Sequence, residues 1–588
     1  MIRALRSQIL ITILTGGVIA LLFALVCPQQ LYIQEQYQLF LWNWNYAKEI
    51  LMYPGGVADW LGRFCTQFMA NRWTGGIVLG VLLAWVQWHA GLLVDGSRFH
   101  AMSLIPSFLL AAYMLDENAL LGGVLAVLIC QLAAWGLRNL HGMFLRSIVF
   151  LVATPLLYRV VGPIALCFAL MHLMFEIRHR RQSQSLWRRV SCGIILLTVV
   201  EIICWPWLIS TIFPVSYSQA VWGFHYYRVP DAHPWWLFSA AWSLVLISFI
   251  DIWIRRRNER QWRSIYLALS SLGMAATLTL GLLALRDTAK ERSLRSMHLT
   301  VTQQWDTLLH DARRTAPSTP QQLAALNLAL AMQHRLGAEM FHFEGQSRAS
   351  LLPHFEGDAI SPLIPAEIYF QMGMTNTAQR FTFEAQEAIP DGQKSALCYR
   401  RLAETNLING SLDVARKYLL ALRQTLFYAE WATQMLQLVD HPERIDRHPV
   451  YGRMRQLQQQ ADFTFNEDTP DRMLGPLLMS NVSNTLALEY LGAYLLLEGR
   501  LDDLAGIVQY GASAGLQPLP RHWQEALSLW WSRNHSDLQG ISQWVSPDLT
   551  QPLAQFYQST ASPGTTPQQL DSRFGNTYWY YFFTHFAQ

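Results

Sequence analysis

Nine apolar stretches fill the first half of the chain, and they constrain its fold more than any other feature. They lie at about residues 9–26, 73–94, 99–115, 119–136, 144–160, 161–177, 191–213, 234–254 and 264–285. A helix that crosses the hydrocarbon core of a bilayer needs about 20 mainly apolar residues. We therefore predict an all-α, polytopic membrane domain over residues 1–286 with about nine spans. Its short hairpin at 144–177 either spans the membrane twice or is re-entrant.

The start of the chain resembles a signal peptide, because two arginines precede an apolar run. That run, at 9–26, is long for a signal peptide, and no A-x-A cleavage site follows it. We therefore expect a retained first helix.

The composition indicates a membrane protein with a substantial soluble part. Of the 588 residues, 52% are apolar and only 14% are charged, which is too apolar for a typical soluble protein. The formal net charge of +3 is small for this length, and no basic block accompanies a nucleic-acid-binding motif. We expect no nucleic-acid partner.

Basic residues between the apolar stretches predict the orientation, because short cytoplasmic loops are enriched in Lys and Arg. With the N-terminus inside the cell, fifteen basic residues fall in inside segments and five in outside loops. This ratio predicts that residues 28–72, 116–118, 214–233 and everything after 286 lie outside the cytoplasm. In a bacterial inner membrane, the N-terminus would be cytoplasmic and the C-terminal domain periplasmic.

The second half, residues 287–588, reads as amphipathic helices without a run of membrane length. In three stretches a helix ends at a glycine, namely Gly373, Gly410 or Gly499, and another resumes with a small or apolar residue five positions later. This resembles the helix-turn-helix of tetratricopeptide repeats. Because the spacing is irregular, we predict an α-solenoid-like array, with an ordinary helical bundle as the alternative. Such a surface would hold an envelope protein or a glycan.

Two C-terminal stretches combine aromatic and polar residues, "LPRHWQEALSLWW" at 519–531 and "RFGNTYWYYFFTHF" at 573–586. Their rings would either stack on sugars or pack helices together.

The chain lacks the GxxxxGK[ST] and HExxH motifs of soluble enzymes. The predicted outside ends of the spans are therefore the place to look for chemistry. Glu35 follows the first span, and Asp116 and Glu117 follow the third. Such carboxylates either hold a divalent metal, Mg or Mn, or include a base that activates an acceptor. Alternatively, Asp116 and Glu117 only form a polar turn.

The predicted outside loop at 217–236 contains His225 and Arg228. An arginine fork binds two oxygens of a phosphate, and a lipid phosphate lies at this depth. We therefore predict that Arg228 and His225 bind the phosphate of a lipid carrier.

The first outside loop includes "QEQYQLFLWNWNYAKEILMYPGGVADWLGRFCTQF" at 34–68, which is too polar for lipid and unusually aromatic for a solvated loop. Leu39, Phe40, Trp42 and Tyr46 fit one face of a helix that lies along the membrane. A break at 53–56 is followed by a second short helix with Asp59 near its start. Asp59 is our second candidate, after Glu35, for a catalytic carboxylate. Cys27 and Cys65 flank this loop and are candidates for a disulfide.

The layout resembles the glycosyltransferase C superfamily, polytopic enzymes that move a sugar from a lipid-phosphate carrier on the external face. In that superfamily the first long external loop carries a catalytic acidic residue, and some members have further acidic residues in the next external loop. The resemblance implies Glu35 for the first position, and Asp116 and Glu117 for the second.

A closer resemblance covers nearly the whole chain. The stretches "YPGGVADWLGRFCTQF", "YLLALRQTLFYAEWA", "NVSNTLALEYLGAYLLL", "LPRHWQEAL" and "TYWYYFF" are similar to a family of polytopic Bacteroidetes membrane proteins that is a domain of unknown function. This implies a membrane location and no particular activity.

Two functions follow as hypotheses. One is a transferase that moves a sugar from a polyprenyl-phosphate carrier to an acceptor, with membrane lipids around it. The other is a non-catalytic scaffold, anchored by its spans, whose helical array recruits envelope proteins. Transport is less well supported, because the spans carry few of the mid-membrane charges that a coupled transporter needs.

Overall fold

The computed structural model describes residues 2–93, 101–180, 185–223, 226–228, 233–254, 264–354, 356–458, 469–513, 518–533, 535, 539–562 and 566–586. Over these residues the fold is helical, and the only extended pairing is an isolated bridge between Ala119 and Arg228. The predicted all-α class is confirmed.

The chain divides into two compact units. Unit 1 contains Met1–Glu291 together with two later segments, Pro390–Ala396 and Ala421–Trp431. Unit 2 contains Arg292–Ile389, Leu397–Leu420 and Ala432–Gln588. Two segments of the predicted C-terminal domain, 287–588, thus fall in unit 1.

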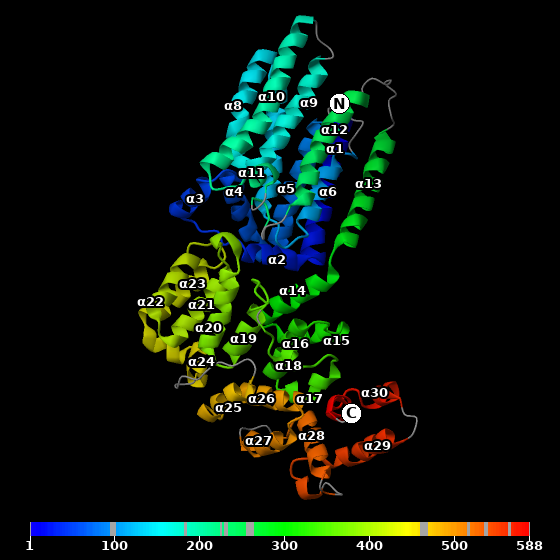
Figure 1. Ribbon diagram of the computed structural model, residues 1–588, viewed down its shortest axis with the longest axis vertical. Coiled ribbons are helices and arrows are strands. Elements are labelled where there is room, and N and C mark those ends of the chain that lie inside the picture. Colours follow the sequence, from blue (N-terminus) through cyan, green and yellow to red (C-terminus); the bar gives the residue numbers. More distant parts are fainter. Residues whose placement is uncertain are drawn as a thin grey trace. The chain divides into compact units, whose positions relative to one another are not determined.

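Each of the nine apolar stretches forms a helix in unit 1. These helices are α1 (Ile2–Leu21), α5 (Arg72–Leu93), α6 (Leu104–Tyr113), α7 (Leu121–Arg138), α8 (Met143–Val161), α9 (Ala165–Arg180), α10 (Ser185–Ile212), α12 (Trp235–Ile254) and α13 (Ser264–Leu285). Helix α1 continues into a π-helical turn at Leu22–Val26 and packs along α5, while α9 contacts both α8 and α10. Figure 1 shows α8, α9 and α10 running side by side.

Fewer helices than predicted are long and apolar enough to cross a membrane. Within the described ranges there are five: Gln8–Val26, Arg72–Leu93, Leu121–Arg138, Phe144–Glu176 and Ile195–Ile212. A sixth candidate is the pair Leu269–Leu285 and Thr288–Val301, bent by 68°. The predicted count of nine is too high by this measure, because α6 has only 10 residues, or about 15 Å, against a core about 30 Å thick.

The stretch Phe144–Glu176 is an antiparallel hairpin rather than one straight helix. It turns at the 3-10 segment Gly162–Ile164, where Gly162 has a φ of +78°. Across the hairpin, Arg146 Nε donates to Glu176 Oε1 at 2.7 Å, and the rings of Phe150 and His172 stack with centroids 4.1 Å apart. The predicted hairpin at 144–177 is therefore present.

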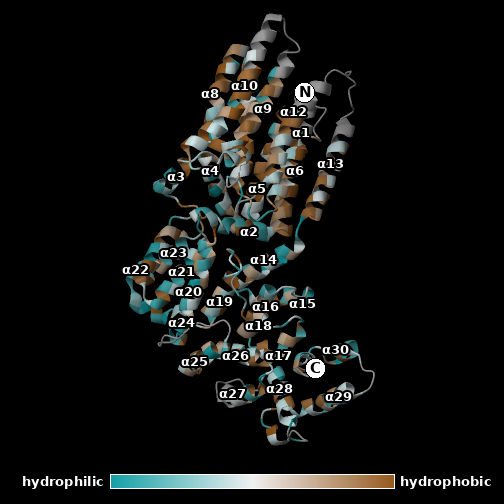
Figure 2. Ribbon diagram, in the orientation of Figure 1, coloured by the Kyte–Doolittle hydropathy of each residue, from teal (hydrophilic) through white to brown (hydrophobic). Residues whose placement is uncertain are grey.

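Several loops of unit 1 meet at one end of these helices, which we call the loop end. Gly55 N donates to Arg159 O at 3.0 Å, and Leu120 N donates to Tyr227 O at 3.0 Å. Glu117, which follows α6, forms an ion pair with Lys290, which follows α13. The segments predicted to lie outside the cytoplasm therefore share one end of the unit. Figure 2 shows hydrophobic residues concentrated on the helices that lead to it.

The segment between α1 and α5 forms three short helices at the loop end: α2 (Pro28–Gln36), α3 (Trp44–Leu51) and α4 (Gly56–Thr66). The predicted break at 53–56 and the position of Asp59 in the first turn of α4 are confirmed. The predicted helix through Leu39, Phe40 and Trp42 is wrong, because helix α3 begins only at Trp44. The stretch before it is held out of helix by backbone bonds from Leu39 N to Lys394 O (2.9 Å) and from Trp42 N to Gln424 O (2.7 Å).

The cysteines of this segment are free thiols. Cys27 is buried and Cys65 is half-buried, and no disulfide joins them. Burial raises the pKa of the Cys27 thiol to about 12 and that of Cys65 to about 11.

Unit 2 begins within α14 (Thr288–Val301) and is a succession of helices. They include α15 (Trp305–Arg314), α16 (Pro320–Met332), α19 (Leu363–Gln371), α20 (Thr375–Glu387), α21 (Ala396–Asn409), α22 (Leu412–Leu422), α23 (Ala429–Asp440), α24 (Tyr451–Leu457), α25 (Asp471–Ser480), α26 (Thr485–Leu497), α27 (Leu501–Ser513), α28 (Arg521–Ser532), α29 (Thr550–Ala561), α30 (Pro567–Phe574) and α31 (Tyr578–Phe586).

The three predicted glycine turns are present in these helices. Gly373, Gly410 and Gly499 have φ values of +80°, +79° and +67°, a conformation that glycine adopts without strain. The residues five positions later, Ala378, Ala415 and Leu504, are fully buried. The local hairpins are therefore confirmed, but a tetratricopeptide-like solenoid is not.

The aromatic C-terminal stretches pack helices together. Trp523 in α28 and Tyr578 and Trp579 in α31 are at most 1% exposed. Trp579 Nε1 donates to the Glu525 carbonyl at 3.0 Å, and Tyr578 N donates to the Glu525 carboxylate at 2.8 Å. These rings have no free face for a sugar.

Candidate functional site

A cavity of about 540 Å³ opens at the loop end of unit 1. Helices α3 and α4, the loop before and after α11 (Tyr217–Trp222), and the turn at 391–394 form its walls. Its charged side chains are Glu49, Asp59, Arg63, Asp391 and Lys394, and its tyrosines are Tyr46, Tyr53, Tyr226 and Tyr227. A concave site that mixes aromatic walls with a few charges is typical of a ligand-binding site.

Asp59 and Arg63 form the central ion pair of the cavity. Arg63 Nε lies 3.0 Å from each carboxylate oxygen, and Nη2 lies 2.8 Å from Oδ2. The two side chains are only 24% and 15% exposed. Burial alone would lower the pKa of Arg63, but the Asp59 charge and Tyr46 outweigh it and hold the pKa above its ordinary value. The cavity therefore contains a carboxylate and a permanently charged guanidinium side by side.

Close backbone packing fixes the position of α4. A Cβ atom on Gly62 would lie 2.4 Å from the backbone nitrogen of Gly122 in α7, and one on Gly122 would lie 3.1 Å from the Asp59 Cα. Real Cβ atoms do not approach as closely as 2.4 Å, so this crossing requires a glycine at position 62. The α4–α7 contact thus holds Asp59 at a defined place on the cavity wall.

The two neighbouring tyrosines after α11 have different roles. The Tyr227 hydroxyl donates to Val161 O at 2.5 Å and accepts from Ile164 N at 3.2 Å, so it ties the α8–α9 turn to this loop. The buried Tyr226 hydroxyl has no hydrogen-bond partner among the described residues. Burial raises the pKa of Tyr226 to about 12, so this hydroxyl remains a donor at neutral pH.

Glu35 lies outside the cavity lining, in a buried network below the turn at 391–394. It is 2% exposed, and both of its oxygens accept from the Tyr428 hydroxyl, at 3.3 and 3.1 Å. Gln36 Nε2 also donates to Glu35 Oε2, and the Ser395 hydroxyl donates to Gln36 Oε1 at 2.9 Å. Burial raises the pKa of Glu35 to about 8, although the Tyr428 hydrogen bond opposes this. Glu35 is therefore a mainly neutral group that joins α2 to the two late segments of unit 1.

Asp116 and Glu117 each pair with a cation. Asp116 accepts from Arg228 Nε, and Glu117 accepts from Lys290 Nζ. Asp116 Oδ1 also accepts from Asn118 N at 3.0 Å, as expected of the polar turn that was our alternative. None of these side chains lines the cavity. The structure thus brings Asp116 and Arg228 together, and neither lines the cavity that contains Asp59.

The other predicted site features have no geometry to support them. His225 lies outside the described residues. Within the described part of the chain, no group of three or more His, Cys, Asp and Glu side chains could hold a metal ion. Asp116 and Glu117, the predicted ligands of Mg or Mn, are instead paired with Arg228 and Lys290.

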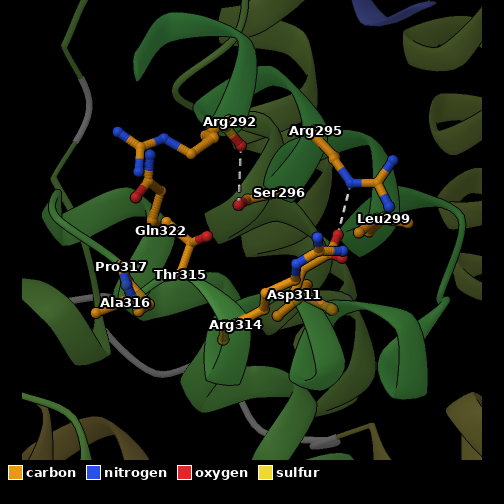
Figure 3. A pocket seen from close by; sticks show the side chains of 12 residues that line it. Arg292, Arg295, Ser296, Leu299, Asp311, Arg314, Thr315, Ala316, Pro317 and Gln322 are labelled. Atoms are coloured by element: carbon orange, nitrogen blue, oxygen red, sulfur yellow. Dashed lines mark hydrogen bonds and ion pairs between the residues drawn. The ribbon is translucent and has the colours of Figure 1, made fainter. Parts of the chain in front are cut away.

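Unit 2 has a smaller pocket, of about 190 Å³, between α14, α15 and the start of α16 (Figure 3). Arg292, Arg295 and Arg314 line this pocket, but Arg295 is paired with Asp311. The Ser296 hydroxyl donates a hydrogen bond to the Arg292 carbonyl at 3.1 Å. Figure 3 shows the Arg292 and Arg295 guanidinium groups pointing to opposite sides. The arginines therefore do not converge on one ligand position.

Sequence reasoning missed three parts of the site. The pair of Asp59 and Arg63 has the i, i+4 spacing of facing residues on a helix, which was a readable signal. Tyr428 and the turn at 391–394 had no signal, because Tyr428 lies 393 residues from Glu35 in the sequence.

The comparisons with known proteins identify a family but no activity. No curated protein and no solved structure matches the chain. The family described as "Family of unknown function (DUF6057)" matches residues 3–585, which is nearly the whole length. The chain therefore belongs to this family of unknown function.

Proposed function

We propose that this protein is a membrane transferase that moves a sugar from a lipid-phosphate carrier to an acceptor in the loop-end cavity. The observation that carries the proposal is the position of Asp59, a carboxylate on the wall of a cavity of about 540 Å³ and in contact with a guanidinium. The resemblance to the glycosyltransferase C superfamily supports it, since an acidic residue in the first external loop is catalytic there. Asp59 takes this role in preference to Glu35, which is buried outside the cavity.

We further propose that the loop end faces the periplasm of a bacterial inner membrane. The nine apolar helices would then all cross or enter the bilayer, with α6 as a short member. The excess of basic residues at the opposite ends of the apolar stretches supports a cytoplasmic N-terminus. Unit 2 would lie in the periplasm and hold the acceptor.

In the proposed reaction Asp59 acts as the general base. It takes the proton of an acceptor hydroxyl or amide while the acceptor atom attacks the anomeric carbon of the sugar. The bond to the acceptor forms as the bond between the anomeric carbon and the carrier phosphate breaks, and the electron pair leaves with the lipid phosphate.

Arg63 couples the two halves of this reaction. While Asp59 is ionised, the carboxylate engages the guanidinium through a bidentate contact. Once Asp59 accepts the proton, the guanidinium loses its negative partner and is free to stabilise the departing phosphate.

The test is glycan profiling of envelope material from cells that carry Asp59→Asn, with Asp440→Asn as the matched control. Asp440 is an exposed acid of unit 2 that also pairs with an arginine. We expect Asp59→Asn to remove a glycan, and Asp440→Asn to leave the profile unchanged. An unchanged profile at normal Asp59→Asn protein levels would overturn the transferase.

A non-catalytic scaffold is the second candidate. The hairpins of unit 2, with their turns at Gly373, Gly410 and Gly499, favour it, because helical arrays commonly bind proteins. In that case Asp59→Asn would leave the glycans unchanged, while deletion of the protein would change which envelope proteins are recovered together.

A further inference from the structure

An aromatic groove lies on the other side of α3 from the cavity. It has a volume of about 330 Å³ and is lined by Phe40, Leu41, Trp42, Asn43, Trp44, Ala47, Leu51 and Trp60. Trp44 is 74% exposed and Trp42 is 56% exposed, which is unusual for the largest apolar side chains. The groove therefore presents a continuous apolar surface that the described residues leave uncovered.

Helix α3 separates this groove from the cavity. The residues that it contributes to the groove are Trp44, Ala47 and Leu51, whereas those that it contributes to the cavity are Tyr46, Glu49 and Ile50. These two sets have helical spacing and occupy two faces of one helix. In α4, similarly, Trp60 lines the groove while Asp59 and Arg63 line the cavity. A polar compartment and an apolar compartment are thus one helix diameter apart, about 10 Å.

The floor of the groove is rigid. The Phe40 ring packs edge-on against Trp42 with centroids 5.4 Å apart, and against Phe64 at 5.7 Å. Trp60 packs on the same Phe40 ring at 5.6 Å. Interlocked aromatic rings lose little further conformational entropy when a ligand binds, so the groove is preorganised.

The polar atoms of the groove distinguish between a hydrocarbon chain and a peptide. Its one polar side chain, Asn43, is engaged as the N-cap of α3, where Oδ1 accepts from Asn45 N at 2.9 Å. A peptide would bury a row of backbone N–H groups, whereas the groove side chains offer them no acceptor besides the engaged Asn43 Oδ1. A hydrocarbon chain has no polar group to satisfy and suits this lining.

The position of the groove in the chain gives access to lipid. It lies in the segment between the candidate spans Gln8–Val26 and Arg72–Leu93, and therefore next to a membrane surface whenever these helices span. Exposed tryptophans are favoured at this depth because their rings are apolar and their N–H groups are polar.

We propose that the groove binds the hydrocarbon chain of an amphiphile whose polar head occupies the cavity. This rests on the proposed function, because it assigns the groove to the lipid part of the carrier. It also adds a specificity: a water-soluble sugar donor would fill the cavity alone and would leave Trp44, Trp42 and Leu51 without a partner.

The test is photo-crosslinking of the full-length protein in its native membrane. The photoreactive residue p-benzoylphenylalanine replaces Trp44 in one variant and Trp42 in a second, so that failure of one to fold leaves the other. The matched control replaces Tyr557, an exposed aromatic residue of unit 2. After irradiation and purification, the mass of the intact protein identifies what has been attached.

We expect adducts with the mass of a lipid at positions 44 and 42 and none at position 557. An adduct with a protein at positions 44 and 42, or no adduct at either in correctly inserted protein, would overturn the proposal. Crosslinking needs no catalysis, so the two proposals fail separately. Lipid adducts with unchanged glycans in Asp59→Asn cells would remove only the transferase. Changed glycans without lipid adducts would remove only the groove.

Discussion

The Tyr428 hydroxyl donates a hydrogen bond to the Glu35 carboxylate at 3.1 Å, across 393 residues of sequence. This contact joins the helix that follows the first candidate span to a segment that follows α22 in the chain. The Glu35 side chain is buried and Tyr428 is half-buried, and Gln36 and Ser395 extend the network. The network ties α2 to Ser395, next to the turn at 391–394 that lines the cavity, and its charge state makes the stability of unit 1 depend on pH.

We expect the protein to lose stability as the pH rises from about 5 to 8. Burial raises the pKa of Glu35 from its ordinary value of 4.5 to about 8, so between these values the folded state holds a proton that the unfolded state has lost. This contribution is fully present below pH 4.5 and is lost as the pH passes 8, with a slope of up to about 1.4 kcal/mol per pH unit.

The variant Glu35→Gln keeps the shape of the side chain and removes its titration. Its melting temperature in detergent should vary less with pH than that of the unaltered protein, with the difference largest near pH 8. Glu430→Gln, a change of an exposed acid in the same late segment, is the control and should follow the unaltered protein. Equal pH dependence in all three proteins would contradict the assignment of Glu35.

Because α4 and α7 cross so closely, adding one methyl group at the crossing should lower the stability of the protein. Gly62→Ala places a Cβ 2.4 Å from Gly122 N, so the two helices must separate, at a cost of about 1–3 kcal/mol. Gly17→Ala is the control, because a Cβ there meets no atom within 4 Å. Thermal unfolding should show a lower melting temperature for Gly62→Ala alone. A normal value would mean that α4 is not held by this contact.

The buried ion pair in the cavity should matter more for stability than an exposed one. Arg63→Ala leaves the Asp59 carboxylate without its cation at a site where the arginine was 15% exposed, so we expect a loss of about 3–5 kcal/mol. Arg416→Ala breaks a pair whose side chains are 41% and 56% exposed, which should cost about 0–1 kcal/mol. The comparison uses chemical unfolding of both variants. Similar losses would show that the cavity is as well solvated as the surface.

The orientation is open to a labelling experiment. Asp413→Cys places a thiol on exposed helix α22 of unit 2, and Asn139→Cys places one after α7, at its far end from the cavity. If the loop end is periplasmic, a membrane-impermeant maleimide should label position 413 in spheroplasts and position 139 only after lysis. The reverse pattern would invert the proposed topology.

Much of the helical framework was predictable, because helix boundaries and glycine turns are local properties of the sequence. The turns at Gly373, Gly410 and Gly499, the break before α4 and the position of Asp59 all follow from neighbouring residues. The 144–177 hairpin was equally readable, since Gly162 and Pro163 interrupt an apolar run. The number of spans was overestimated because hydropathy does not reveal that α6 ends after 10 residues.

The errors at the site have a common physical cause. Leu39, Phe40 and Trp42 fit one helix face, but the backbone amides of Leu39 and Trp42 bind the carbonyls of Lys394 and Gln424, which no local pattern indicates. Glu35 was predicted to be catalytic because it follows a span, yet its burial depends on Tyr428. Asp59 was the second candidate, and only its place on the cavity wall raises it above Glu35.

The late segments Pro390–Ala396 and Ala421–Trp431 also bear on how the protein is made. When the last apolar helix leaves the ribosome, the amides of Leu39 and Trp42 and the Glu35 carboxyl group still lack the partners that the finished chain gives them. Those partners are synthesised only at residues 394, 424 and 428. The membrane unit therefore cannot mature in the order of its sequence. It must remain open until part of unit 2 has been translated, and a fragment that stops at residue 291 would retain the helices without completing the cavity.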